Sequence, residues 1–209
     1  MKRHVSHLIA EVIVLVTILN LYRVAMGHNV DAEPAKQTQS NNISYDEAGH
    51  AISIFVPARN VTDDNLSQIT ELESIQKIQL GGCAHLTPNG ITNLLKLQHL
   101  RRLEICGYNP ERHLIPVISR LQTLTQLKFA ASTLGTNDAQ YLSSMTNLVE
   151  LTLSHPMTLG TNGLLSLTNL PHLESLNFGD RGVPDDLVNQ LYKSASRKTF
   201  KISQLYLGL

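Results

Sequence analysis

Apolar side chains recur in a fixed order along most of this chain. The order is clearest in the stretch Leu148–Leu173, which reads LVELTLSHPMTLGTNGLLSLTNLPHL. Leucines at its first, fourth and sixth positions are typical of a short strand that buries one side, because side chains alternate along a strand. A polar turn follows, and leucines then return every three positions from Leu164 to Leu173. The pattern predicts a strand and then a segment that turns the chain back.

The strand pattern can be laid along the chain seven times. Its copies begin at Ala51, Ile75, Leu100, Leu124, Leu148, Leu173 and Ile202. The differences between successive starting numbers are 24, 25, 24, 24, 25 and 29. Five of the strands are also preceded by apolar residues at the same four distances, 14, 9, 6 and 3 positions before the strand start. Of these twenty positions, only Pro110 does not hold an aliphatic side chain. A single unit cannot cover its own apolar edge, so units with this period are expected to stack around a shared core.

The pattern resembles a leucine-rich repeat over residues 51–209, in the short bacterial and cysteine-containing varieties of about 24 residues. The resemblance implies an α/β fold, a right-handed solenoid shaped as a horseshoe or arc. Its parallel sheet would lie on the concave face and its short helices on the convex face. The family's commonest pattern has an asparagine in the turn after each strand. The corresponding positions here hold Cys83, Tyr108, Ser132, Pro156 and Arg181. We therefore do not expect a regular asparagine ladder.

Residues 1–32 lie outside the repeats, which fill residues 51–209 as six full repeats and a terminal strand. Lys2 and Arg3 precede an apolar run from Leu8 to Leu21, an order typical of a secretory signal peptide. An uncleaved membrane anchor is the alternative, although the run is short of the ~20 residues that span a membrane. Both interpretations predict an exported protein that is periplasmic, secreted or anchored by this segment. Residues 33–50 are expected to form a linker and the N-terminal edge.

Polar residues precede the second half of most repeats, where they could accept hydrogen bonds from the free amides of a helix start. The candidate caps are Thr62, Asp63, Asp64, Thr87, Thr136, Asn137, Asp138, Thr161, Asn162, Asp185 and Asp186. The acidic pairs among them recur at one phase of the repeat, so we interpret them as caps and not as an acid–base pair.

Composition and motifs exclude several kinds of function. The 17 basic and 17 acidic residues balance, which argues against binding to nucleic acid or to anionic membranes. The sequence has no HExxH, GxSxG, P-loop or CxxC motif, so we predict no enzyme, no catalytic residue and no cofactor. The nine histidines do not indicate a metal site, because His99 and His172, which share a phase, lie three repeats apart, too far for one ion.

The two cysteines lie in adjacent repeats at different phases. Cys83 is eight positions past a strand start, and Cys106 is six. This mismatch favours two free thiols, with Cys83 buried and Cys106 facing outward at a strand end. A disulfide in an oxidising compartment is the alternative.

The strand residues that face away from the core are the candidate binding surface. At the third position of successive strands they are Ser53, Lys77, Arg102, Gln126, Glu150, Ser175 and Gln204, and at the fifth they are Phe55, Gln79, Glu104, Lys128, Thr152, Asn177 and Tyr206. We predict a protein-binding site at the centre of this face. Its residues are Lys77, Gln79, Arg102, Glu104, Gln126, Lys128, Glu150 and Thr152. The alternative is a solvated sheet in which the neighbours Glu104 and Lys128 neutralise each other.

The resemblance implies a recognition scaffold that binds another protein through its concave face. We expect such a protein to be a monomer that touches a membrane only through its N-terminal segment. The alternative is a structural or assembly protein of the cell envelope, which would associate through an uncapped C-terminal strand at Ile202–Leu207. The two hypotheses differ in whether the purified protein associates with itself.

Overall fold

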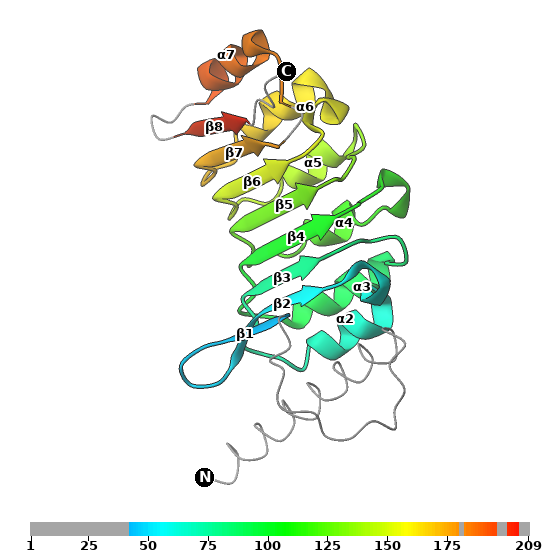
Figure 1. Ribbon diagram of the computed structural model, residues 1–209. Coiled ribbons are helices and arrows are strands. Elements are labelled where there is room, and N and C mark those ends of the chain that lie inside the picture. The colour runs from blue at the N-terminus through cyan, green and yellow to red at the C-terminus, as the bar shows by residue number, and fades with distance from the viewer. Residues whose placement is uncertain (1–41, 180–181, 196–199, 205–209) are drawn as a thin grey trace, which may run out of the picture.

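The computed structural model describes residues 42–179, 182–195 and 200–204. Their strands form one eight-stranded sheet in sequence order, and short helices line one face of it (Figure 1). The predicted signal peptide or anchor lies outside the described residues. Within the described part, no helix has the length and apolar character needed to cross a membrane.

Seven of the strands are parallel, as predicted, and the first is antiparallel to the second. The strands are β1 (Ile43–Tyr45), β2 (Ala51–Val56), β3 (Lys77–Leu80), β4 (Arg102–Cys106), β5 (Gln126–Ala130), β6 (Glu150–Leu153), β7 (Ser175–Phe178) and β8 (Lys201–Gln204). The pairing runs from Ser53 through Lys77 and Arg102 to Lys201, and the residue number rises by a nearly constant step from each strand to the next. Equivalent positions of consecutive strands therefore lie side by side.

The segments between the strands contain short helices. The α-helices are α2 (Asp63–Ile69), α3 (Pro88–Asn93), α4 (Ile115–Ile118), α5 (Asp138–Leu142), α6 (Gly160–Leu167) and α7 (Asp185–Ser194), and the 3-10 helices are η1 (Ala58–Asn60), η2 (Leu94–Lys96), η3 (Pro110–Arg112) and η4 (Pro156–Leu159). Helices this short are not stable in isolation, so their packing against the sheet must stabilise them.

The predicted caps are confirmed at two helices and wrong at others. Thr62 and Thr87 accept hydrogen bonds from helix-start amides at 3.3 and 3.2 Å. Thr161 lies inside α6, because η4 leads directly into that helix at Gly160, whose φ of +70° suits glycine. Asp63 binds the next segment instead, accepting hydrogen bonds from the Thr87 amide at 2.9 Å and hydroxyl at 2.5 Å.

One apolar core lies between the sheet and the helices. In β2 to β7 and the segments between them, the predicted apolar positions whose side chains are described are at most 5% exposed. Where Pro110 interrupts the pattern, Tyr108 and Leu114 are buried, and the Tyr108 ring lies 6.0 Å from that of Phe129. The periodicity thus predicted the core correctly in this part of the chain.

The prediction for the last strand is wrong by three residues. Lys201 pairs with Ser175 and Ser203 with Asn177, so Ile202 takes the fourth strand position and not the first. The third and fifth positions therefore hold Lys201 and Ser203 in place of Gln204 and Tyr206, and Tyr206 lies outside the described residues. The step from β7 to β8 is shorter than the sequence pattern suggests and close to the steps between the other paired strands, and Phe200, just before β8, is buried.

Candidate functional site

Figure 1 shows the helices on one face of the sheet, and we call the other face the open face. Along the strands the third and fifth positions alternate with the buried core positions, so they lie on the open face. Its residues are Ser53, Phe55, Lys77, Gln79, Arg102, Glu104, Gln126, Lys128, Glu150, Thr152, Ser175, Asn177, Lys201 and Ser203. All eight predicted binding residues are among them, on the four adjacent strands β3 to β6. The sheet register brings them together because the strands are paired without slippage.

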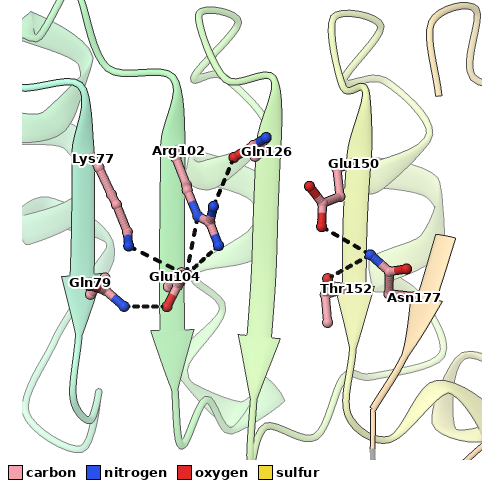
Figure 2. A network of polar contacts seen from close by, with 8 residues as sticks. All are labelled: Lys77, Gln79, Arg102, Glu104, Gln126, Glu150, Thr152 and Asn177. Atoms are coloured by element: carbon pink, nitrogen blue, oxygen red, sulfur yellow. Dashed lines mark hydrogen bonds and ion pairs between the residues drawn. The ribbon is translucent and has the colours of Figure 1, made fainter. Parts of the chain in front are cut away.

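Glu104 is the centre of one polar cluster on this face (Figure 2). It is only 7% exposed, which differs from the alternative of a solvated sheet. Gln79 Nε2 donates to its Oε2 at 2.5 Å, and Arg102 Nε and Nη2 donate to its Oε1 at 3.1 and 2.8 Å. Lys77 Nζ is 3.9 Å from the same oxygen. Two cations on neighbouring strands thus share one carboxylate, which offsets their mutual repulsion.

The pKa of Glu104 follows from these contacts. Burial alone would raise it, but the hydrogen bonds from Gln79 and Arg102 and the charges of Lys128 and Arg102 together hold the pKa below its usual value of 4.5. Glu104 is therefore a carboxylate at neutral pH, and its hydrogen-bonding capacity is largely used within the sheet.

Asn177 is the centre of a second cluster, in the C-terminal half of the face (Figure 2). Its Nδ2 donates to Glu150 Oε1 at 3.0 Å and to Thr152 Oγ1 at 3.4 Å. Its Oδ1 accepts hydrogen bonds from the hydroxyls of Ser175, at 3.1 Å, and of Ser203. The predicted site omits Asn177. Asn177 occupies the fifth strand position next to Thr152 on the neighbouring strand, and this position could have identified it from the sequence.

Lys128 lies between the two clusters. It is paired in register with Glu104 on one side and Thr152 on the other. The direct Glu104–Lys128 contact considered from the sequence is not formed, because Arg102 and Lys77 occupy the carboxylate. Within the described part of the chain, the Lys128 ammonium has no hydrogen-bond or ion-pair partner.

Two hollows lie near this surface. The smaller, of about 120 Å³, lies on the open face and is lined by Arg102, Gln126, Leu127, Lys128, Glu150 and Thr152. The larger, of about 630 Å³, lies where the strands begin and is lined by Arg101, Gln122, Thr123, Thr125, Asn147, Val149, Pro171, His172 and Glu174. Five of the eight predicted binding residues line the smaller hollow, and none lines the larger one.

Both cysteines are free thiols, as predicted. Burial raises the pKa of Cys83 to about 12, with a further contribution from Cys106. Burial, followed by the charge of Glu104, also raises the pKa of Cys106, which is partly exposed at the end of β4. Thiols with a raised pKa are poor nucleophiles at neutral pH, so neither is suited to covalent chemistry.

The described residues contain no group of three or more His, Cys, Asp or Glu side chains placed to hold a metal ion. No known protein-family model matches the chain, and no curated protein matches it. The function is therefore argued from the geometry of the open face.

Proposed function

We propose that this chain is a leucine-rich-repeat protein that binds another protein through its open face. The support for the repeat is the nearly constant step in residue number between paired strands, together with the buried apolar positions that accompany each step. In this proposal the parallel sheet forms the concave side of a solenoid arc, and the helices form its convex side.

The observation that carries the binding proposal is the prearranged polar surface of the open face. Glu104 and Asn177 hold the side chains around them through seven hydrogen bonds, which fix Arg102 and Thr152 before any partner arrives. Side chains that are already ordered lose less conformational entropy when they bind, so such a surface is favourable for recognition.

The role is a binding role without a catalytic step. The pKa of Glu104 is lowered and the pKa values of both cysteines are raised, so none of these groups titrates near neutral pH as a general acid or base does. The proposal needs no cofactor, nucleic acid or membrane contact by the repeats.

Assembly through the C-terminal strand is the alternative function, and the packing of α7 weighs against it. The Tyr192 hydroxyl accepts a hydrogen bond from the Ile202 amide at 3.1 Å and donates to the Ile202 carbonyl at 3.4 Å. The Lys201 amide donates to the backbone carbonyl of Glu174, next to β7. Backbone groups of successive strand residues point to opposite sides, so the amide and carbonyl of Ile202 point to the outer edge of β8. Tyr192 therefore occupies the amide and carbonyl of Ile202, to which a second strand would otherwise hydrogen-bond.

Binding through the open face can be tested by replacing a small side chain on it with a bulky one. The full-length chain would be used as bait in an extract of the source organism, and captured proteins would be quantified by mass spectrometry. Thr152→Tyr places a ring at the centre of the open face on a strand, where tyrosine is well tolerated. We expect it to reduce capture of the specific partner at least about tenfold.

The matched control is Thr92→Tyr, which makes the same change at an exposed position of α3 on the helix side. It should leave capture unchanged. A partner that Thr92→Tyr releases and Thr152→Tyr retains would bind the helix side and would contradict the proposal.

We also propose that the protein is exported, on the strength of the basic residues and apolar run within residues 1–32. Fractionation of the source cells should find the repeats outside the cytoplasm, and N-terminal sequencing of the mature protein should begin near His28 or Glu33 if the segment is cleaved. Recovery of the intact chain from the cytoplasm would contradict the proposal.

A further inference from the structure

We infer that the smaller hollow on the open face receives the carboxylate of an aspartate or glutamate side chain from the partner protein. The inference rests on the proposed binding function of the open face and specifies the partner's chemistry at one position. It follows from the hydrogen-bonding capacity that remains around Lys128.

Three groups at this hollow have donor capacity left over. The Lys128 ammonium has no partner among the described residues. The Gln126 oxygen accepts a hydrogen bond from Arg102 Nη1 at 3.2 Å, and because arginine can only donate, this contact fixes the amide so that its NH₂ group remains for another acceptor. Thr152 Oγ1 accepts from Asn177, so its own proton can be donated elsewhere.

The size and lining of the hollow suit the tip of an acidic side chain. Its volume of about 120 Å³ is far above the ~10–15 Å³ that admits one water molecule, so a carboxylate and an adjoining methylene can enter. No aromatic side chain lines it, so it offers no surface on which a ring could stack. A carboxylate accepts several hydrogen bonds and donates none, which matches a set of unused donors.

The charges around the hollow favour an anion, with one opposing group. Lys77, Arg102 and Lys128 outnumber the carboxylates Glu104 and Glu150 on the neighbouring strands. Glu104 is already engaged by Arg102 and Lys77, so the Lys128 ammonium keeps its N–H donors for a ligand, although its charge also stabilises the Glu104 carboxylate. Glu150 lies on the rim, bound through one oxygen to Asn177, and its charge should weaken binding of a carboxylate.

The larger hollow is less suited to a carboxylate, because several of its side-chain donors are bonded to backbone carbonyls. Arg101 Nη1 donates to the carbonyls of Gln98 and Leu100 at 2.9 and 3.2 Å. Asn147 Nδ2 donates to the carbonyl of Gln122 at 2.7 Å. These hydrogen bonds stabilise the turns before the strands and direct Arg101 Nη1 and Asn147 Nδ2 to backbone carbonyls.

The test is a titration that needs no knowledge of the partner. The full-length chain, labelled with ¹⁵N, is titrated with N-acetyl-glutamate α-amide, and its neutral match, N-acetyl-glutamine α-amide, serves as the control ligand. We expect saturable shifts at the Gln126 side-chain amide and around Lys128 with the glutamate compound only. Equal responses to the two compounds, or no saturable response, would overturn the inference.

Two variants should change the affinity in opposite directions. Lys128→Gln removes the charge that binds the carboxylate and should weaken binding at least about tenfold. Glu150→Gln removes the opposing charge, retains an oxygen for Asn177, and should strengthen binding about threefold. Lys96→Gln, at an exposed position of η2, should have no effect. Binding that is indifferent to both open-face variants would show that the anion binds elsewhere.

The outcome is separable from that of the proposed function. If Thr152→Tyr releases the partner but the glutamate compound does not bind, the open face binds a protein without this carboxylate contact. If the compound binds at Lys128 but Thr152→Tyr retains the partner, the anion site stands and the proposed interface is wrong.

Discussion

The Ser132 hydroxyl connects two neighbouring strand segments from inside the core. It is 1% exposed, accepts a hydrogen bond from the Tyr108 amide at 2.9 Å and lies 3.2 Å from the Ile105 carbonyl, to which it can donate. Ser154 makes an equivalent contact, donating to the Phe129 carbonyl at 2.7 Å. Ser132 and Ser154, in the turns after β5 and β6, thus satisfy buried backbone groups.

Ser132→Ala should lower the free energy of unfolding by ~1–3 kcal/mol, because it leaves the Tyr108 amide buried without an acceptor. Urea titration monitored by circular dichroism measures the difference. Ser144→Ala, at an exposed turn after α5, is the matched control and should change stability by less than about 0.5 kcal/mol. Equal losses for the two variants would show that the Ser132 contact does not stabilise the fold.

The two thiols should differ in their reactivity with an alkylating reagent. Cys106 is partly exposed, whereas Cys83 is buried with a pKa raised to about 12. In the native protein at pH 8 we expect Cys106 to be modified first and Cys83 to react only after unfolding, because thiolate and access are both required. Mass spectrometry of the digested protein follows each site. A count of zero free thiols under denaturing, non-reducing conditions would contradict the structure.

At the scale of strands and helices, the sequence predicted the features that depend on which side chains are buried. A strand that buries one side must repeat its apolar positions, so β2 to β7 and their register follow from the pattern. Burial does not dictate how a helix starts, and Thr161 was therefore placed wrongly. Burial also gives little information about the register of the edge strand β8, because Ile202 is only partly buried and the apolar pattern there is weak.

The same limit applies to the site. The register predicts that Arg102, Glu104 and Lys128 lie on one face of adjacent strands. It does not predict which cation binds the carboxylate, because that depends on side-chain rotamers. Arg102 reaches Glu104 along its own strand with two donors, a geometry that a single ammonium across the sheet does not match.

The Glu104 cluster should make the stability of the protein depend on acid pH. The folded-state pKa of Glu104 lies below its usual value of 4.5, so its contribution is present above that value and is lost as the pH falls through the folded pKa. We expect wild-type stability to fall as the pH is lowered below about 4.5 and Glu104→Gln to lose less over the same range. Urea midpoints at several pH values provide the measurement.

Glu174→Gln is the control for this experiment, because Glu174 is exposed near the start of β7. Its pH profile should match that of the wild type. At pH 7, Glu104→Gln should itself be less stable than the wild type, since Arg102 and Lys77 lose their shared carboxylate. An unchanged acid profile for Glu104→Gln would mean that the cluster does not hold the pKa down.

At the scale of the whole molecule, a sheet of eight strands in sequence order has two edges, and both have protective features. β1 pairs antiparallel with β2 and is only three residues long, which leaves a short strand at the N-terminal edge. At the other edge, α7 places Tyr192 against β8. Overall charge contributes little to keeping copies apart, because the 17 acidic and 17 basic residues cancel.

Tyr192→Phe tests whether the second feature keeps the protein monomeric. The change removes only the hydroxyl that binds the Ile202 amide and carbonyl, while the ring can keep its edge-on contact with Phe200, at 6.4 Å between centroids. The freed backbone groups point outward from β8 and can pair with the same edge of a second copy. We expect the wild type to sediment as a monomer over a wide concentration range and Tyr192→Phe to show concentration-dependent association. A wild type that already dimerises through β8 would favour the assembly role over recognition by the open face. A variant that stays monomeric at the highest concentrations would show that something other than the Tyr192 hydroxyl protects this edge.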